Sequence, residues 1–314
     1  MRENNKILTI SIAAYNVDKF LDKTLQSLYK CKNLEKIEVL IINDGSADRT
    51  EEIAKKYVEK NSRVFRLVTK ENGGYGSTIN TSISMARGKY YKLLDGDDWY
   101  ESDNLNEYIF FLEMCDKDCV YSPYWAISDD RKVLYKCENN KKRDGLQADC
   151  ICMHALAFRT KLLKNNDIII TEKCFYTDAE YNLKALLYVQ SIDYFEKPIY
   201  CYRLGNEGQS VSKTGWLKHY KEHNKVTLEI MKAYTDAKVK GNSIWLEEEL
   251  IQYIKNIYKT NFFIAVNLKN KEVWNNYICL EKAIETRFPV FLKYANIKMK
   301  IIKGLRYKVV YLFM

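Results

Sequence analysis

Three carboxylates stand within four residues, at Asp95, Asp97 and Asp98. Carboxylates this close repel one another unless a cation lies between them. Their hard oxygen atoms suit Mg²⁺ or Mn²⁺, and such an ion can bridge protein carboxylates to a diphosphate. The alternative is an acidic turn that is solvated at the end of a strand. Taken alone, the motif supports both interpretations equally.

A fourth carboxylate, Asp44, follows an apolar segment inside an Asn-Asp-Gly-Ser turn. An aspartate in this place can simply bond its own backbone and form the turn. It can also accept the imide proton of a uracil ring, and the preceding aromatic residue Tyr15 could stack on that ring. Each interpretation is open when the motif stands alone.

A glycine-rich segment, Gly73-Gly74-Tyr75-Gly76-Ser77, precedes an expected helix. Such a loop lets backbone amides approach a ligand, and the start of a helix favours anions. It is neither the G-x-G-x-x-G motif of a dinucleotide fold nor a P-loop, because the spacing differs and no Gly-Lys-Ser/Thr follows. The segment therefore argues against a dehydrogenase and against a kinase.

Asp178 lies at an expected helix start, in the sequence Phe-Tyr-Thr-Asp-Ala-Glu. One interpretation is an N-cap aspartate. The other is a general base, held rigidly by the helix end and directed toward a substrate. His219 and His223 stand four residues apart on an expected helix and could share a metal ion, although a packed or solvent-facing pair is favoured.

The elements that must position these residues alternate between strands and helices over the first hundred residues, which predicts an α/β fold with a mainly parallel sheet and helices on both faces. The expected strands are Ile7–Ala13, Ile37–Ile42, Val64–Val68 and Tyr90–Leu94, and the expected helices are Asp18–Lys30, Asp48–Val58 (opened by an Asp48/Glu51 capping box) and Ser77–Ala86. A polar cluster follows each strand. Since ligands bind outside the carboxyl ends of parallel strands, the four clusters should meet in one crevice of a nucleotide-binding type.

Beyond Trp99 the alternation weakens, with strand or mixed segments expected at 120–127, 162–170 and 191–202 and a helix at 179–187. From about Trp216 the pattern is helical and rich in lysine. We therefore predict one domain over residues 1–215, which divides into two halves at 1–100 and 101–215. A basic helical region is expected over residues 216–314.

The composition fits a protein with one sizeable core. The chain has 314 residues, of which 47% are hydrophobic, and a formal net charge of +9 that is spread along the sequence and says little about nucleic acid. Its start shows no signal peptide, and no uncharged apolar stretch reaches the roughly 18 residues of a membrane span. The nine cysteines lack paired C-x-x-C units, so reduced thiols in the cytoplasm are the expectation.

The motifs together resemble the bacterial, inverting members of glycosyltransferase family 2, which have the GT-A fold. The resemblance is carried by SIAAYN, VLIINDGSADRT and ENGGYGSTINTSISMARGKYYKLLDGDDW over about residues 7–100. MHALAFRTKLL, CFYTDAEYNLKALLY and PIYCYRLGNEGQSVS are similar to the acceptor half of a subgroup of that family. The last third of the chain carries no motif of this kind.

The resemblance implies a role for each matching residue. Tyr15 and Asp44 would hold the base, most often uracil, and the nucleotide contacts would come from Ala14, Tyr15, Asn16, Asp44, Asn72, Gly73, Gly74 and Asp95. Asp95 and Asp97 form the D-x-D element that binds Mn²⁺ or Mg²⁺, with Asp97 the more direct ligand and Asp98 supporting the loop. Asp178 would be the catalytic base. Thr177 stands where many relatives have an acidic residue, so the surroundings of Asp178 differ from those in these relatives.

Three further residues are candidates for contacts with the diphosphate or the acceptor: Arg203, Ser210 and His154. For Arg203 the alternative is a surface arginine on a loop. The expected function is transfer of a sugar from a nucleotide diphosphate, most often a UDP-sugar, to a hydroxyl group in the synthesis of a cell-surface polysaccharide or glycolipid. A nucleotidyltransferase that makes a sugar nucleotide, or a non-catalytic protein that binds one, is the alternative.

The segment 293–314 holds six Lys/Arg and no acidic residue. Its apolar residues recur at helical spacing and share one face, with most of the basic residues opposite. This pattern is typical of a helix at an anionic membrane surface, and equally of a core-packed helix with a solvated basic face. The expectation is a cytoplasmic protein with weak peripheral contact to the membrane, which would suit a lipid-linked acceptor.

Overall fold

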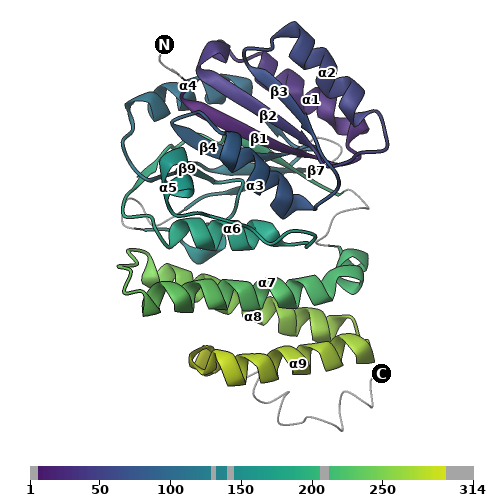
Figure 1. The fold of residues 1–314 in the computed structure, drawn as a ribbon, viewed down its shortest axis with the longest axis vertical. Coiled ribbons are helices and arrows are strands. Elements are labelled where there is room, and N and C mark those ends of the chain that lie inside the picture. Colours follow the sequence, from purple (N-terminus) through teal and green to yellow (C-terminus); the bar gives the residue numbers. More distant parts are fainter. Residues whose placement is uncertain (1–5, 129–131, 140–144, 206–211, 295–314) are drawn as a thin grey trace.

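The computed structural model describes residues 6–128, 132–139, 145–205 and 212–294. Its larger sheet has seven strands in the order β10-β6-β9-β4-β1-β2-β3, and only β9 runs antiparallel to its neighbours. These strands are β1 (Leu8–Ala14), β2 (Ile37–Asn43), β3 (Phe65–Thr69), β4 (Tyr90–Asp95), β6 (Cys119–Tyr121), β9 (Leu156–Arg159) and β10 (Ile192–Tyr194). The predicted mainly parallel α/β fold is confirmed (Figure 1).

The centre of this sheet is covered on both faces. Every residue of β2 is buried, and so is nearly every residue of β1, because helices pack on either side of these apolar strands. The helices of this part are α1 (Asp18–Tyr29), α2 (Thr50–Lys60), α3 (Tyr75–Met85), α4 (Ser102–Met114), α5 (Thr160–Asn165) and α6 (Thr177–Leu186), with short 3-10 turns η1 (Leu34–Lys36) and η2 (Ala148–Cys150).

A smaller sheet of four strands, in the order β5-β11-β7-β8, stands beside the larger one. Its strands are β5 (Trp99–Tyr100), β7 (Tyr124–Ser128), β8 (Val133–Cys137) and β11 (Tyr200–Leu204). Because β5 begins directly after the acidic turn at 95–98 and β11 pairs with β5, the small sheet brings Tyr200 and Arg203 to that turn.

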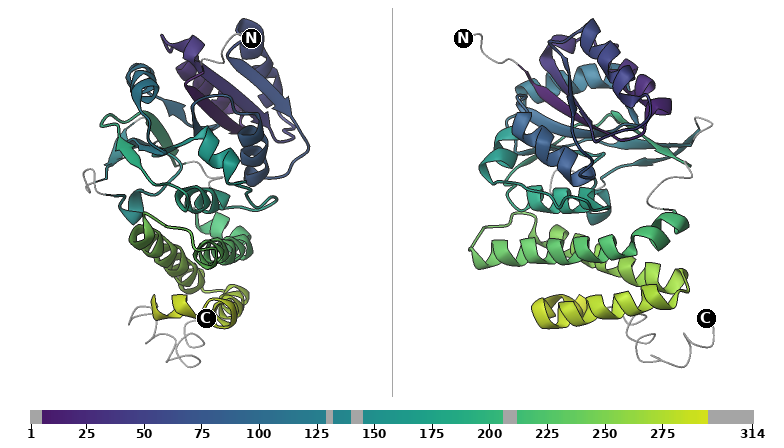
Figure 2. Two further views of the ribbon diagram at one scale, coloured as in Figure 1. Left: turned by 60° about the vertical axis from the view of Figure 1, so that its left-hand side comes forward. Right: turned by 45° about the vertical axis from the view of Figure 1, so that its right-hand side comes forward.

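The C-terminal part is helical, as predicted, and consists of α7 (Lys213–Val239), α8 (Glu247–Asn267), α9 (Lys271–Arg287) and a final turn η3 (Pro289–Tyr294). These helices lie in successive layers below α6 (Figures 1 and 2). Buried side chains form one continuous cluster from β1 to η3, so the helices share a core with the sheets. None of the described helices combines the length and apolar character that crossing a bilayer requires.

Two local predictions are wrong. The expected capping box does not form, because α2 begins at Thr50 and Asp48 accepts a bond from the Thr50 amide. Glu51 accepts a bond from the Asn43 side chain instead. The segment expected to be strand or mixed at 162–170 is instead the end of helix α5 followed by irregular chain. Asp167, with a φ of +46°, ends the helical course. All nine cysteines are free in this structure.

The proposed interfacial segment 293–314 lies almost wholly outside the described residues, and so does Ser210.

Candidate functional site at the carboxyl ends of the strands

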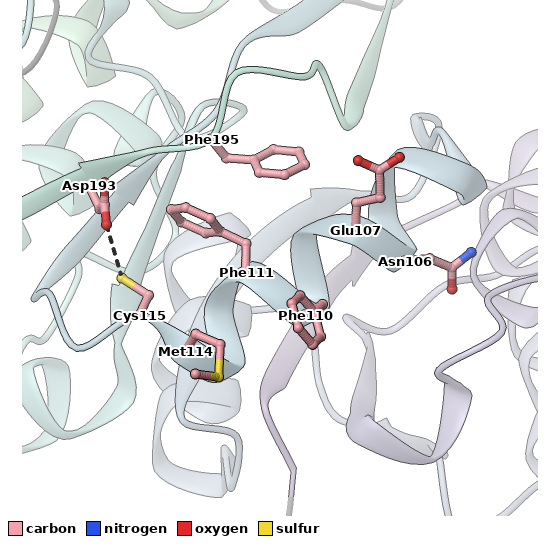
Figure 3. Close-up of a pocket in the computed structure, with 8 residues that line it drawn as sticks. All are labelled: Asn106, Glu107, Phe110, Phe111, Met114, Cys115, Asp193 and Phe195. Atoms are coloured by element: carbon pink, nitrogen blue, oxygen red, sulfur yellow. Dashed lines mark hydrogen bonds between the residues drawn. The ribbon is translucent and has the colours of Figure 1, made fainter.

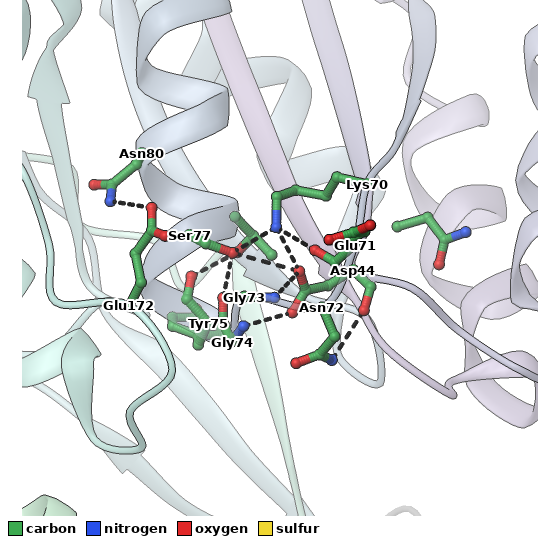
Figure 4. A network of polar contacts seen from close by, with 12 residues as sticks. Asp44, Lys70, Glu71, Asn72, Gly73, Gly74, Tyr75, Ser77, Asn80 and Glu172 are labelled. Atoms are coloured by element: carbon green, nitrogen blue, oxygen red, sulfur yellow. Dashed lines mark hydrogen bonds and ion pairs between the residues drawn. The ribbon is translucent and has the colours of Figure 1, made fainter.

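Asp44 lies directly after β2 and is buried, and its carboxylate organises the glycine loop (Figure 4). One oxygen accepts bonds from the Gly73 amide (2.9 Å) and from Lys70 Nζ (2.9 Å), and the other accepts a bond from the Gly74 amide (2.8 Å). Asn72 Nδ2 donates to the Asp44 carbonyl (2.9 Å). The aspartate therefore holds the loop in place, in addition to any contact it makes with a base.

The glycine loop approaches the other half of the domain closely. Gly74 has a φ of +78°, which favours glycine, and it stands just before α3. A Cβ on Gly76 would lie 2.1 Å from the Thr171 carbonyl oxygen, so a larger residue there would force the two segments apart. Lys173 N donates to the Gly73 carbonyl across the same junction. The segment that leads into Asp178 is thus fixed directly to the loop.

The end of β1 and the residues after it lie beside Asp44. Ala14 is buried, and its carbonyl accepts a bond from the Asp44 amide (2.9 Å). Asn16 adopts a left-handed φ of +52°, which asparagine tolerates, and its Oδ1 accepts a bond from the Ala47 amide (2.9 Å). Between them Tyr15 is 53% exposed, so its ring is accessible for stacking.

The acidic turn after β4 is buried unevenly. Asp95 Oδ1 accepts a bond from the Tyr75 hydroxyl (2.8 Å). Burial, and then the neighbouring charge of Asp97, raises the pKa of Asp95 to about 7. Both oxygens of Asp98 accept bonds within the protein, from Tyr200 OH (2.6 Å) and the Arg203 amide (2.7 Å). That is the loop-supporting arrangement that the family resemblance implies for Asp98.

Among the described residues, Asp95, Asp98 and His154 form a group whose ligand atoms all lie within 4.8 Å of one another. Two hard carboxylate oxygens and an imidazole nitrogen suit Mn²⁺, and the carboxylates suit Mg²⁺. A cation would also offset the cost of burying neighbouring negative charges, a cost visible in the raised pKa values of Asp95 and Asp98. The donor set therefore fits a divalent ion, although Asp97 is not one of its three members.

Three aromatic rings contact His154. Its ring stacks on Tyr202 (4.3 Å between centroids) and lies beside Tyr200 (4.6 Å) and Tyr124 (5.2 Å). Its Nδ1 is buried without a hydrogen-bond partner within the described part of the chain. Burial, with a smaller effect of Lys92, lowers the pKa of His154 to about 3, so the ring is neutral and can act as a ligand or an acceptor.

Arg203 lies on β11 against the acidic turn. Its Nε donates to the Asp97 carbonyl (3.0 Å), and its guanidinium lies over Phe20 (4.7 Å) and Trp99 (5.3 Å). A guanidinium oriented in this way is compatible with a contact to phosphate.

Asp178 is the second residue of α6, so it is not the N-cap; that position belongs to Tyr176. It is partly buried, and burial raises its pKa, against the opposing effect of the Ala179 and Asp178 amides. Its charge contributes to raising the pKa values of Asp95 and Tyr75. Asp178 therefore lies close enough to Asp95 and Tyr75 for its charge to act on both.

Sequence reasoning missed four residues of this site: Lys70, Tyr75, Met153 and Tyr200. Tyr75 could have been found, because it stands inside the glycine motif. Lys70 and Tyr200 belong to ordinary strand ends, and nothing in their spacing singles them out.

A separate apolar pocket lies between α4 and the segment after β10 (Figure 3). It is lined by Phe110, Phe111, Met114 and Phe195, among others, and contains none of the predicted site residues.

Residues 9–178 match the family described as Glycosyl transferase family 2. The glycosyltransferase EpsJ of Bacillus subtilis is 28% identical over 211 residues, which are 63% of this chain and 61% of that relative, less than two thirds of its length.

Two solved structures are similar in fold. TarS 1-349 of Staphylococcus aureus in complex with UDP-GlcNAc has a TM-score of 0.58 at 18% identity, over 90% of this chain and 92% of that one. The mannosyltransferase PcManGT of Pyrobaculum calidifontis in complex with GDP-Man and Mn²⁺ has a TM-score of 0.52 at 14% identity, over 96% and 87%. Such likenesses show the fold, which is the predicted GT-A fold. Since the family match extends over more than half of the 314 residues, the chain belongs to glycosyl transferase family 2.

Proposed function

We propose that this protein is an inverting glycosyltransferase that moves a sugar from a nucleotide diphosphate, most often UDP, to a hydroxyl of a cell-surface polysaccharide or glycolipid. The observation that carries the proposal is that Asp44 and Asp95 lie at the carboxyl ends of parallel strands, and that the segment before Asp178 is bonded to the glycine loop that Asp44 holds. Open α/β sheets bind nucleotides at the carboxyl ends of their strands. The relatives support the class of reaction, since TarS is a poly(ribitol-phosphate) beta-N-acetylglucosaminyltransferase.

In this proposal the base lies between Tyr15 and Asp44, with the ribose and diphosphate extending past the glycine loop toward Asp95. Asn72, Gly73 and Gly74 line that path, with Ala14 and Asn16 on its other side. Asp95 and Asp97, with Asp98 and His154 nearby, would hold the divalent ion. When bound, that ion would neutralise charge on the diphosphate. Arg203 would add a second positive charge as the diphosphate leaves.

Asp178 would take the proton from the acceptor hydroxyl. The acceptor oxygen forms a bond to the anomeric carbon as the bond from that carbon to the diphosphate oxygen breaks on the opposite side. One displacement of this kind inverts the anomeric configuration. General-base assistance contributes about 10²–10⁴ in rate.

The class of donor can be tested with a panel of UDP-, GDP-, CDP- and dTDP-sugars, each with and without Mn²⁺. The expected result is binding and slow hydrolysis of one UDP-sugar that depends on the metal, measured by calorimetry and by release of the nucleoside diphosphate. Failure of all four classes to bind would contradict the proposal.

The bonds around Asp44 lead to a specific prediction. In Asp44→Asn an amide NH₂ group replaces one acceptor, so at least one of the Gly73 and Gly74 amides loses its partner. We expect a loss of about 1–3 kcal/mol in the free energy of unfolding, measured by urea denaturation, together with weaker UDP binding. Lys70→Met is the matched control, because it removes the bonds from Lys70 to Asp44, Glu71 and Ser77 but keeps the bonds from the Gly73 and Gly74 amides to Asp44. Equal stability of Asp44→Asn and wild type would show that the carboxylate does not hold the loop.

The proposed peripheral contact of residues 293–314 with an anionic membrane stays a prediction, and it would suit a lipid-linked acceptor.

A further inference from the structure

The helices α7 and α8 both contact the segment that carries Asp178, α7 through ring contacts and α8 through a hydrogen bond. Phe175 stacks on His219 of α7, with 3.6 Å between ring centroids and 23° between planes. The next residue, Tyr176, meets His223 edge-on at 4.9 Å. Two consecutive aromatic residues shortly before Asp178 therefore each contact a histidine, and the two histidines lie one turn apart on the same helix.

The other side of Asp178 is also held by the helical region. On α8, the buried Tyr253 donates its hydroxyl to the carbonyl of Ala179 (3.4 Å). The charge of Asp178 contributes to raising the pKa of Tyr253, which is consistent with the phenol lying close to the carboxylate. The contacts from α7 and α8 thus bracket Asp178 in the sequence, at 175–176 and at 179.

The two histidines are themselves fixed in place. His223 Nδ1 donates to Asn261 Oδ1 of α8 (2.8 Å), and Asn261, which is 3% exposed, donates in turn to Thr227 Oγ1 (2.7 Å). His219 interrupts the helical backbone of α7 with φ −121° and ψ 17°, and its Nδ1 donates to Glu222 (3.3 Å). The kink in α7 therefore occurs at the residue that stacks on Phe175.

The backbone of Tyr176 needs such support. Its φ of +64° is left-handed, a conformation that aromatic residues rarely adopt. Strained residues of this kind persist where surrounding contacts hold them in place, and they gather at functional sites. Tyr176 is also the N-cap of α6, so its conformation sets the direction in which α6 begins and hence where Asp178 lies.

We propose that His219 and His223 are positioning residues, which fix the Phe175–Tyr176 turn and through it the carboxylate of Asp178. The inference rests on the proposed role of Asp178 and extends it to the C-terminal helices, which carry no family motif. The last third of the chain is on this view a part of the catalytic site. A misplacement of about 1 Å in a catalytic group can cost about 10²-fold in rate.

The test compares His219→Ala and His223→Ala with wild type. We expect kcat for sugar transfer to fall between tenfold and a hundredfold, while the KM for the donor stays within twofold, because the base and diphosphate contacts lie on other elements. His219→Phe keeps a ring against Phe175 and should recover most of the rate. Ile230→Ala, at a buried position of α7 two turns beyond His223, controls for general destabilisation. At temperatures below its melting point this variant should keep the wild-type kcat.

Two further measurements keep the outcome decisive. Hydrogen exchange of the amides at 176–182 should accelerate in both histidine variants and not in Ile230→Ala, a result that needs no activity. If a histidine variant fails to fold, Tyr176→Asn can replace it, because this substitution removes the ring that contacts His223. Asparagine tolerates a left-handed φ, so the backbone can keep its conformation. The variant should show the same decrease in kcat.

If both histidine variants transfer sugar at the wild-type rate and show wild-type hydrogen exchange at 176–182, the inference is overturned and the proposed function stays intact. An equal loss of donor binding in the histidine variants and in Ile230→Ala would overturn it as well, because the effect would be general unfolding. Full transfer by Asp178→Asn would instead remove the proposed base, and the positioning role with it.

Discussion

Replacing Asp178 with asparagine is expected to reduce the rate of sugar transfer by about 10²–10⁴ and to leave donor binding unchanged. The substitution keeps the size of the side chain and removes its basicity. The decisive comparison is kcat for transfer against the dissociation constant of the donor, measured on the same preparation. Asp193→Asn, in the separate pocket beside α4, is the control and should transfer at the wild-type rate.

The pH dependence of transfer gives a second measure of the same residue. Burial raises the pKa of Asp178 above the value of about 3.9 of an ordinary aspartate. As the pH falls, its carboxylate therefore becomes protonated earlier than an ordinary aspartate does, and it can then no longer accept a proton. The acid limb of kcat should therefore lie above that value and disappear in Asp178→Asn. A wild-type transfer rate in the variant would assign the base to another group.

Loss of the acidic turn should have an effect of similar size. Asp95→Asn and Asp97→Asn are each expected to abolish the Mn²⁺ dependence of donor binding and to lower kcat by roughly 10²–10³, the equivalent of several kcal/mol of charge stabilisation. The measurement is donor affinity with and without Mn²⁺ by calorimetry. Retention of the full Mn²⁺ effect in both variants would place the ion elsewhere.

The same series separates two possible ligand sets. The family resemblance names Asp95 and Asp97, whereas the geometry groups Asp95 with Asp98 and His154. If His154→Gln weakens Mn²⁺ binding as much as Asp97→Asn does, the histidine is a ligand. Asp98→Asn is expected to act mainly on stability, since both of its oxygens already accept bonds from the small sheet.

The sequence predicted the nucleotide half of the fold in detail, because apolar strands and polar strand ends follow one another there without interruption. Strands β1 to β4 lie within one or two residues of their expected bounds. Asp44 and Asp95 lie at the carboxyl ends of β2 and β4, as expected, and the roles of these residues and of Asp178 stay predictions. In this half of the chain, local pattern and tertiary structure agree.

Other features depend on contacts between distant segments and leave no local signal. Lys70 is an ordinary lysine at a strand end until the fold brings it to Asp44, and Tyr200 reaches Asp98 only through the pairing of β11 with β5. Segment 162–170 was mispredicted because its apolar residues suit a strand, whereas Asn80 of α3 pairs with the backbone of Ile170 instead. The histidine contacts to Phe175 and Tyr176 belong to the same class.

We expect a nucleotide diphosphate and a divalent ion to bind at the carboxyl ends of β1, β2 and β4. The most direct measurement is a crystal structure of the protein with UDP and Mn²⁺, in which the anomalous signal of manganese locates the ion. We expect the uracil ring to lie between Tyr15 and Asp44, and a manganese peak to lie within coordinating distance of Asp95. A nucleotide bound elsewhere, or a manganese peak away from the 95–98 turn, would contradict it.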